Sequence, residues 1–481
     1  TFLCSLPLSN ISRVINKGFV TSFTSIPPYT PCAWTSIFTG VNPGKHCAYG
    51  FYRVSKSASF NVSPATSYHV MYPRGFEMAS MFNRRSIVAN TPLTYPPHAL
   101  TGLKNFIVIS DWASPKQFIY PRQYEKRYCE YLAEPPHRWF EATDAKEYVK
   151  KVEKFLATRL NLYYELLERE DFDLFIVIFS ELDWLMHRIP DLIIGRQLHY
   201  VYKILTLIDS FIGRAAEVCD LIVLLSDHGF MVSHVLIGVN RVLASKGFLA
   251  YRYKFDVGKL VRRPRHLSSK YGMGTHSSYV HSLILGRVFT FIKRLVPLHV
   301  LGRLGSLAPV SVGIDYSNSI AFMLEADAWD IYVKSGWLDT VKDIFTKNIF
   351  VEKVLTKDDV FWGPYIDLAP DLILVPRNHV FFDTRVYSEP IYATYIGEHE
   401  PHAFLAIYGD DVVPSKPIDV NVSMYDIVPT ILAYLGLPVP HDTDGKMLTE
   451  ILPSIPRPIR KFNYLQRFKV LRRIKRSQVY E

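Results

Sequence analysis

The sequence places an aspartate and a histidine four residues apart, at Asp183 and His187, just after the apolar run Leu174–Phe179. In a helical turn this spacing puts both side chains on one face. A carboxylate oxygen and an imidazole nitrogen on one face can share a divalent cation. A capping aspartate and a partly buried histidine would give the same spacing, and on spacing alone that structural interpretation is favoured.

A second pair of ligand-type residues, Asp227 and His228, directly follows the apolar run Leu221–Leu225. Burying an unpaired carboxylate costs free energy, so such residues at the end of a buried strand need a partner. Gly229 comes next and lets the chain turn so that both side chains can face one point. A polar turn with a solvated aspartate is the alternative, but this is the stronger of the two signals.

Two further residues, His399 and Thr30, carry chemistry only in combination with these pairs. His399 follows Gly-Glu in a loop before the expected strand Ala403–Tyr408, and most loop histidines are simply exposed. Thr30 is expected at the N-cap of a short helix over Pro31–Thr39. Free backbone N–H groups and the helix dipole favour a phosphate or an oxyanion there. An ordinary capping threonine is the alternative.

Buried strands and amphipathic helices alternate along much of the chain. This predicts an α/β fold with a doubly wound, mostly parallel sheet and helices on both faces. The active site would then lie outside the carboxyl ends of the strands, where both ligand pairs stand. Runs typical of strands buried on both faces are Leu174–Phe179, Leu221–Leu225 and Leu372–Val375. Helices are expected over Ala145–Arg169, His199–Val218 and Tyr425–Leu435.

The alternation breaks off between about Val232 and Trp362, which predicts an insertion that caps the core. We therefore expect a first part of the catalytic core (1–231), a cap-like insertion (232–362), a second part of the core (363–452) and a basic tail (453–481). The 481 residues are 48% hydrophobic and 21% charged, and this ordinary composition excludes disordered and fibrous classes.

Positive charge is concentrated at the C-terminus. From Arg457 onward there are nine basic residues and one acid, so this segment carries +8 of the net +10. Leu465, Phe468, Leu471 and Ile474 recur there at helical spacing. Such a helix could contact an anionic lipid, RNA or an acidic partner, and a solvated or frayed tail is an equal alternative.

The cysteines and the chain start bear on location. Five cysteines without a Cys-x-x-Cys pair argue against a disulfide framework and favour a reducing, cytoplasmic location. No run of eighteen apolar residues is present, so no transmembrane segment is expected. The chain opens on Thr1 without an initiator methionine or a signal-peptide pattern, and we expect that upstream residues are missing.

Taken together, these motifs resemble those of the type I phosphodiesterase/nucleotide pyrophosphatase family of the alkaline phosphatase superfamily, over nearly the whole chain. Thr30–Gly40 and Asn42–His46 are similar to the nucleophile segment of its prokaryotic branch. The segments similar to its metal-binding motifs are Phe179–His187, Leu225–Phe230 and Gly397–His399, in the family's order. Weaker similarities lie at Pro92–Pro97, Asn240–Leu249, Ala369–Leu372 and Tyr425–Gly445.

The resemblance implies two divalent metal ions, zinc in most members, with manganese as the alternative. One ion would be held by Asp183, His187 and His399, and the other by Asp227, His228 and the Thr30 oxygen. The family has one more aspartate on the second ion, in an Asp-Gly at the end of a first strand. That strand would lie just before Thr1, and the first acidic residue here is Glu77. Either the chain is a fragment or this site is incomplete, and the unusual start favours a fragment.

Three other positions refine the resemblance. Ala33 stands where members of known nucleotide specificity carry an asparagine that helps to bind the phosphoryl group. Trp34 stands where sulfatases need an arginine, which disfavours a sulfatase. His46 fits the family pattern, and we expect it to be structural.

The resemblance implies a metal-dependent hydrolase of phosphoric esters that acts on a small phosphate-ester substrate. Thr30 would attack phosphorus and form a phosphothreonine, which water would then hydrolyse. A phosphomutase of the same superfamily is one rival, although its usual serine nucleophile and the large insertion after it are not seen. A non-catalytic binding protein with an incomplete metal site is the other.

Overall fold

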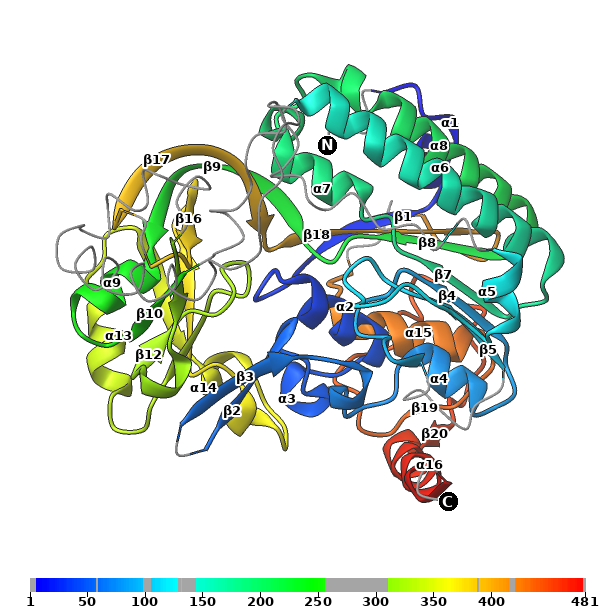
Figure 1. Cartoon of the computed structure of the whole chain (residues 1–481). Coiled ribbons are helices and arrows are strands. Elements are labelled where there is room, and N and C mark those ends of the chain that lie inside the picture. Colours follow the sequence, from blue (N-terminus) through cyan, green and yellow to red (C-terminus); the bar gives the residue numbers. More distant parts are fainter. Residues whose placement is uncertain are drawn as a thin grey trace, which may run out of the picture.

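The computed structural model describes residues 6–57, 59–97, 105–128, 131, 144–255, 310–386, 389–414 and 420–478. Figure 1 shows two lobes: a larger one in which helices lie on both sides of a layer of strands, and a smaller one rich in strands. Asp227 and His228 lie where the chain passes from the larger lobe to the smaller one.

The strand layer of the larger lobe contains two hydrogen-bonded sets. In the first, β4 (Ser86–Ala89) pairs in parallel with β5 (Phe106–Ile109) and with β7 (Leu174–Val177). The short strand β6 (Ile119–Tyr120) pairs with β5 in the antiparallel direction. In the second set, β18 (His402–Gly409) lies between β1 (Phe19–Thr24) and β8 (Leu221–Leu225) and runs antiparallel to both. β1 and β8 therefore run in the same direction.

Helices cover both faces of this layer (Figure 1). One face carries α1 (Ser9–Lys17), α6 (Ala145–Arg169), α7 (Glu181–Arg188) and α8 (Tyr202–Val218). The other carries α2 (Thr30–Thr39), α4 (Gly75–Ser80) and α15 (Ile427–Tyr434). Successive residues of a strand point to opposite faces, so Phe175 and Val177 of β7 pack in one cluster and Leu174 and Ile176 in the other.

Local sequence explains where the principal helices begin and end. The Asp144 carboxylate accepts a hydrogen bond from the Lys146 backbone N–H and so caps α6. Helix α2 has Pro31 in its first turn, where a missing N–H is tolerated. It ends at Gly40, whose φ of 69° lies in the left-handed region that glycine adopts without strain.

The smaller lobe is entered through β9 (Gly229–Gly238), which directly follows the second ligand pair. β9 pairs in parallel with β16 (Val380–Asp383) and antiparallel with β17 (Ile391–Glu400). An antiparallel sheet follows the order β12 (Ala321–Phe322), β13 (Asp330–Val333), β15 (Leu372–Pro376), β14 (Val351–Thr356). The remaining elements are β10 (Tyr251–Phe255), β11 (Val310–Ile314), α9 (Val239–Ser245), α13 (Leu338–Thr346) and α14 (Lys357–Val360). A third hydrophobic cluster, which includes Phe322, Ile331 and Phe345, holds this lobe together.

Short elements complete the described chain. They are α3 (Pro43–His46), the hairpin of β2 (Tyr52–Lys56) and β3 (Phe60–Pro64), α5 (Gln123–Arg127), β19 (Val439–Pro440), β20 (Lys461–Phe462) and α16 (Tyr464–Gln478). Short 3₁₀ turns span Ser67–His69, Pro190–Leu192, Leu198–Tyr200, Tyr316–Asn318, Ile366–Leu368 and Met424–Asp426. No helix among the described residues is both long enough and apolar enough to cross a membrane.

The expected α/β class is confirmed, with three local corrections. His399, which was expected in a loop, lies on the strand β17. The run Leu372–Val375 is a strand, but it lies in the antiparallel sheet of the smaller lobe rather than in the main layer. Burial on both faces makes a strand apolar whatever the direction of its neighbours, so composition could not separate the two cases. Thr30 is the first residue of α2, and Tyr29 takes the N-cap position. The division of the chain at residues 232, 363 and 453 stays a prediction.

Candidate metal centre

Three chain segments bring the expected ligands together. Asp183 and His187 lie on α7, which begins a few residues after β7, and Asp227 and His228 form the link between β8 and β9. His399 lies on β17, which packs against α7. The approach is close because Gly397 has no side chain: a Cβ there would lie 2.1 Å from the Met186 carbonyl oxygen.

The three histidines point the same ring nitrogen toward a common point. The Nδ1 of His187 lies 2.9 Å from the Gly397 carbonyl oxygen, and the Nδ1 of His399 lies 2.9 Å from that of Pro28. The Nδ1 of His228 lies 3.0 Å from the Gly229 carbonyl oxygen. A carbonyl oxygen only accepts, so each Nδ1 carries a proton and donates it. Each Nε2 of the neutral ring is therefore left with a lone pair.

The Nε2 atoms surround one oxygen of Asp183. The Asp183 Oδ1 lies 3.3 Å from Nε2 of His399, 3.8 Å from that of His187 and 3.9 Å from that of His228. The Nε2 atoms of His187 and His399 are themselves 3.0 Å apart. Such a group of acceptors is stable only with a proton or a cation among them. Asp183, His187 and His399 have ligand atoms within 4.8 Å of one another, a spacing that suits one metal ion.

Unpartnered oxygens support a cation at this place. Asp183 Oδ1 and Asp227 Oδ2 are buried and have no hydrogen-bond partner among the described residues. Asp227 Oδ2 also lies 3.4 Å from the Nε2 of His228, so a second group of ligand atoms stands beside the first. Buried carboxylate oxygens need such compensation, and the oxygen and imidazole donors suit zinc or manganese.

Phe230 fixes the orientation of the imidazole rings. Its ring centroid lies 4.9 Å from that of His187, 5.2 Å from that of His399 and 5.6 Å from that of His228. The rings of His228 and His399 also stack, with centroids 3.6 Å apart. Packing and the carbonyl acceptors together position the ligands in advance, as outer partners do in metal sites.

Without a cation, these buried carboxyls and imidazoles do not all take the ionised and neutral forms in which they could bind a metal. Burial, and then repulsion from Asp183, raises the pKa of Asp227 to about 8. Burial and repulsion from His399 hold the pKa of His228 well below its usual value. At His399 burial acts to lower the pKa, but the carboxylates of Asp327 and Asp183 outweigh it and raise the pKa to about 10. A divalent cation would favour ionised carboxylates and neutral imidazoles at the same time.

The Thr30 hydroxyl lies at the edge of this group. Its Oγ1 is 3.5 Å from the Nε2 of His228, and as the first residue of α2 it stands at the positive end of that helix. The next side chains, Cys32 and Ala33, are buried. All six expected site residues are thus brought together by the fold.

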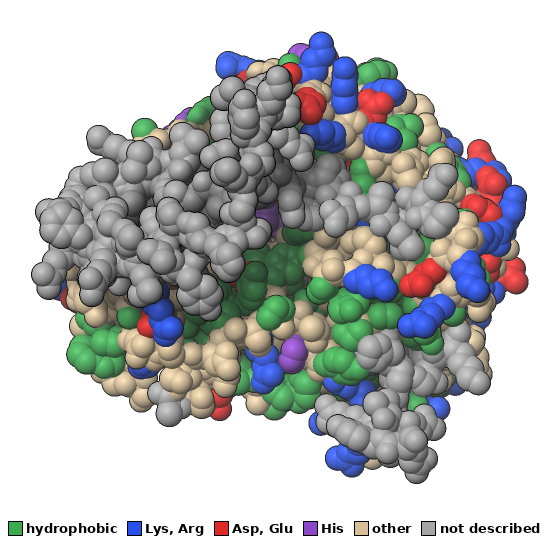
Figure 2. All heavy atoms as spheres, viewed as in Figure 1, with side chains coloured by type: hydrophobic (Ala, Val, Ile, Leu, Met, Phe, Trp, Pro, Cys, Tyr) green, Lys and Arg blue, Asp and Glu red, His purple; other side chains and the backbone are tan. Residues whose placement is uncertain are grey.

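Figure 2 shows one face of the molecule as spheres. This face is hollowed near its middle, with hydrophobic side chains on the floor of the hollow and a histidine at its rim.

A group of carboxylates that sequence reasoning missed borders the centre. Asp327 Oδ1 lies 3.7 Å from the Nδ1 of His399, and Glu398 Oε2 lies 4.0 Å from the Nδ1 of His187. Glu325 accepts a hydrogen bond from the Tyr29 hydroxyl. Burial raises the pKa of Glu325 to about 8, with repulsion from Asp330 as the next cause. The signal was present: three acids stand within six residues, 325–330, of a largely apolar stretch.

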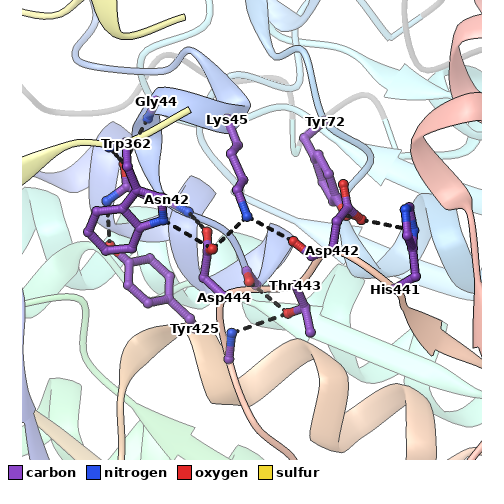
Figure 3. Close-up of polar contacts among 12 residues, drawn as sticks. Asn42, Gly44, Lys45, Tyr72, Trp362, Tyr425, His441, Asp442, Thr443 and Asp444 are labelled. Atoms are coloured by element: carbon purple, nitrogen blue, oxygen red, sulfur yellow. Dashed lines mark hydrogen bonds and ion pairs between the residues drawn. The ribbon is translucent and has the colours of Figure 1, made fainter. Parts of the chain in front are cut away.

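A polar network anchors the far end of α2 (Figure 3). Lys45 binds Asp444 at 2.5 Å and the Asp442 carbonyl oxygen at 2.9 Å. Asp444 also accepts from the Asn42 backbone N–H at 2.8 Å and from the Trp362 indole at 3.1 Å. The network ties Asn42 and the short helix α3 to the C-terminal part of the larger lobe, and so holds the helix that presents Thr30.

His46 lies inside the protein, as expected for a structural residue. Its Nδ1 accepts a hydrogen bond from the Ala48 backbone N–H at 3.1 Å, and its Nε2 lies 2.9 Å from the Ser36 Oγ. Burial lowers the pKa of His46 to about 3. The ring is therefore neutral at physiological pH, with both nitrogens engaged within the fold.

The family comparison agrees with these motifs. A family model described as type I phosphodiesterase/nucleotide pyrophosphatase matches residues 2–285. No match was found among curated protein sequences.

Solved structures similar to this chain share its fold at low sequence identity. A phosphonoacetate hydrolase from Sinorhizobium meliloti 1021, solved with phosphonoformate, is 14% identical, with 88% of each chain covered and a TM-score of 0.52. Murine ectonucleotide pyrophosphatase/phosphodiesterase 5 is 11% identical, with 92% of this chain and 94% of that chain covered and a TM-score of 0.52. The alkaline phosphatase PafA is 14% identical, with 94% and 95% covered and a TM-score of 0.51. The fold is thus alkaline phosphatase-like.

Proposed function

The chain belongs to the type I phosphodiesterase/nucleotide pyrophosphatase family, and from that premise we propose that it hydrolyses small phosphate esters by way of a phosphothreonine at Thr30. The family and the fold indicate a phosphoester hydrolase of the alkaline phosphatase superfamily. The nucleophile, the number of metal ions and the substrate class are our proposal. The observation that carries it is the convergence of three imidazole Nε2 atoms and an unpartnered Asp183 oxygen beside the Thr30 hydroxyl.

The proposed ligand sets are those of the sequence analysis. Asp183, His187 and His399 would hold one cation, and Asp227, His228 and Thr30 Oγ1 a second, zinc or manganese in both cases. When bound, the pair would lower the pKa of the threonine hydroxyl and neutralise charge on the transferring phosphoryl group.

The chain's own residues then have separate roles in the reaction. Thr30 Oγ1 attacks phosphorus, its proton is lost, and the leaving alkoxide departs from the opposite side. The N-terminus of α2 supplies backbone N–H groups to the phosphoryl oxygens. Ala33 offers no side-chain donor to them, so these backbone groups carry more of the phosphoryl binding. Water attacks the phosphothreonine in the second step and regenerates the hydroxyl.

The test measures hydrolysis of bis(p-nitrophenyl) phosphate and p-nitrophenyl phosphate by the purified protein. We expect activity that disappears with a chelator and returns with zinc or manganese. Thr30→Ala should lower the rate on the order of 10³-fold or more, because the covalent step is lost. Thr24→Ala, at an exposed position on β1, is the matched control and should keep the parental rate.

Other outcomes would distinguish the rivals. Full activity in Thr30→Ala refutes the nucleophile assignment. A protein that binds metal and substrate but turns over neither ester is a non-catalytic binding protein. Interconversion of phosphate positions on one substrate, without release of phosphate, indicates a phosphomutase.

The cytoplasmic location and the lipid or RNA contact of the tail stay predictions. Cys32, Cys47 and Cys219 are free thiols, and the other two cysteines lie outside the described residues.

A further inference from the structure

Asn90 lies at the carboxyl end of β4 and has no part in the reaction described above. It is only 1% exposed. Its backbone N–H donates to the carbonyl oxygen of Ile109, the last residue of β5, at 3.2 Å. The Ile178 N–H, which directly follows β7, donates to the Ala89 carbonyl oxygen at 3.2 Å. Because β4 pairs in parallel with both β5 and β7, Asn90 stands where three parallel strands end.

The side-chain amide of Asn90 connects the segments that follow these strands. Its Nδ2 donates to the Ile178 carbonyl oxygen at 2.7 Å and to the Ser180 Oγ at 2.9 Å. Its Oδ1 accepts a hydrogen bond from the Trp112 backbone N–H at 3.0 Å. A primary amide offers two N–H donors and one carbonyl oxygen, so its donor and acceptor groups are all engaged.

The backbone of Asn90 is also unusual. Its φ of 59° lies in the left-handed region, which most side chains avoid and which asparagine tolerates better than they do. Such conformations persist only where the surrounding structure fixes them, and they are concentrated at functional sites. Glycine would adopt this backbone conformation without strain, but it could make none of the three side-chain hydrogen bonds. An asparagine satisfies both requirements.

The first link from Asn90 to the metal centre runs through Ser180. Ser180 is the N-cap residue of α7, the helix that carries Asp183 and His187. The Ser180 hydroxyl caps no N–H group of the helix, and it accepts the hydrogen bond from Asn90 instead. The position at which α7 begins is therefore tied to the end of β4.

A second link runs through Trp112, whose backbone Asn90 holds. The ring centroid of Trp112 lies 6.2 Å from that of Trp184, and the two rings meet edge to face. Trp184 is 4% exposed and is the neighbour of Asp183 on α7. Both links end on the same helix, and the hydrogen bonds of the Asn90 amide all go to residues outside the ligand sets.

We propose that Asn90 is a positioning residue of the metal centre, because its hydrogen bonds fix the start of α7 and so the two ligands that this helix carries. The effect on metal binding rests on the proposed function, whereas the effect on α7 rests on the hydrogen bonds alone. Metal sites require ligand distances that are correct to within about 0.2 Å. Replacing a residue that orients ligands therefore lowers metal affinity, by roughly 10–100-fold in known sites.

Asn90→Gly removes the side chain while it leaves the left-handed backbone unstrained. Asn83→Gly is the matched control, because Asn83 has a φ of 61° and is exposed. Zinc affinity is measured by competition with a chromogenic chelator. Asn90→Gly should raise the zinc dissociation constant by about tenfold or more. Asn83→Gly should change it by less than about twofold, since an exposed substitution has little effect.

Hydrogen–deuterium exchange of the metal-free protein tests the hold on α7 directly. The amides of α7 should exchange about fivefold faster or more in Asn90→Gly than in the parent, because the helix is released at its start. The amides that join β1 to β18 are the internal control and should stay as protected as in the parent. A general loss of stability would increase exchange at both places.

A double-mutant cycle tests the link through Ser180. Ser180→Ala removes the hydroxyl that Asn90 binds, so this variant should also bind zinc more weakly than the parent. The double variant Asn90→Gly/Ser180→Ala should lose less affinity than the product of the two single losses, because both changes break the same hydrogen bond. Fully multiplicative losses would show that Asn90 does not act through Ser180.

Three results separate the inference from the proposed function. Parental zinc affinity and parental α7 exchange in Asn90→Gly would overturn the inference. Equal acceleration in α7 and between β1 and β18 would also overturn it, because Asn90 would then support the fold as a whole. A parent that takes up no zinc would refute the proposed metal centre alone, since exchange in α7 would still decide whether Asn90 fixes this helix.

Discussion

At the scale of single residues, the histidines of the candidate centre are set by atoms outside it. Backbone carbonyl oxygens of Pro28, Gly229 and Gly397 accept hydrogen bonds from the Nδ1–H groups of the three rings. The Nε2 lone pairs are therefore directed at the metal centre. The family resemblance supplied the expected ligand sets, because spacing alone favoured a structural interpretation of Asp183 and His187. It could not predict Asp327, since the contact with His399 joins positions 72 residues apart in the chain.

Glu325 gives a pH-dependent prediction at this scale. The carboxyl has an ordinary pKa near 4.5, and the fold raises it to about 8, chiefly through burial. The native state therefore keeps a proton that the unfolded chain loses, and the free energy of unfolding falls as pH rises from about 4.5 to 8. Glu325→Gln should remove this fall. We expect equal stability of variant and parent near pH 4.5, and a variant more stable by at least about 1 kcal/mol near pH 8.5.

Denaturant unfolding at a series of pH values measures the effect. Glu352→Gln, at an exposed position on β14, is the matched control and should follow the parental pH profile. A Glu325→Gln profile that runs parallel to the parent's across this range would show that the carboxyl is not held neutral by the fold.

At the scale of elements, α2 is held from both ends. Its first residue faces the metal centre, and its last residues lead into the Lys45–Asp444 network of Figure 3. The sequence predicted the extent of α2 to within a residue, because Pro31 and Gly40 mark its ends. It could not predict the network, which joins the short helix α3 to a segment near residue 444, about 400 positions along the chain. The antiparallel pairing of Leu372–Pro376 was missed because a strand that is buried on both faces is apolar whether its neighbours run parallel or antiparallel to it.

Lys45→Met tests this anchoring. The substitution keeps the length of the side chain but leaves the partly buried Asp444 without its cation, so we expect a loss of about 1–3 kcal/mol in the free energy of unfolding. The rate of ester hydrolysis should fall as well, because α2 carries Thr30. Lys347→Met breaks an exposed ion pair with Asp343 and should change stability by less than about 0.5 kcal/mol. Equal losses in both variants would contradict a special role for the network.

At the scale of the whole molecule, the C-terminal helix is part of the larger lobe. Tyr464 and Phe468 of α16 are buried in the cluster on the α2 face. Arg472 donates hydrogen bonds to the carbonyl oxygens of Tyr68 and Val70. The described part of α16 is thus docked by its apolar face. Arg467, Lys469 and Arg473 remain exposed on it. The sequence predicted the helical spacing of α16, but it could not predict whether the larger lobe has a surface on which this helix packs.

Phe468→Ala should therefore destabilise the protein by about 3 kcal/mol, because it deletes a buried aromatic ring. Val470→Ala, two residues on, removes a side chain that is 48% exposed and should cost less than about 0.5 kcal/mol. Thermal unfolding of the two variants provides the comparison. Indistinguishable midpoints would mean that α16 contributes nothing to the stability of the lobe.

The proposed ligand set of Asp183, His187 and His399 requires a bound divalent cation, which equilibrium dialysis with zinc measures. Chelator-treated protein should take up zinc, Asp183→Asn should bind at least one equivalent less, and Asp343→Asn, at an exposed position on α13, should bind as the parent does. Equal zinc content in the parent and Asp183→Asn, or no zinc in the parent, would contradict this ligand set.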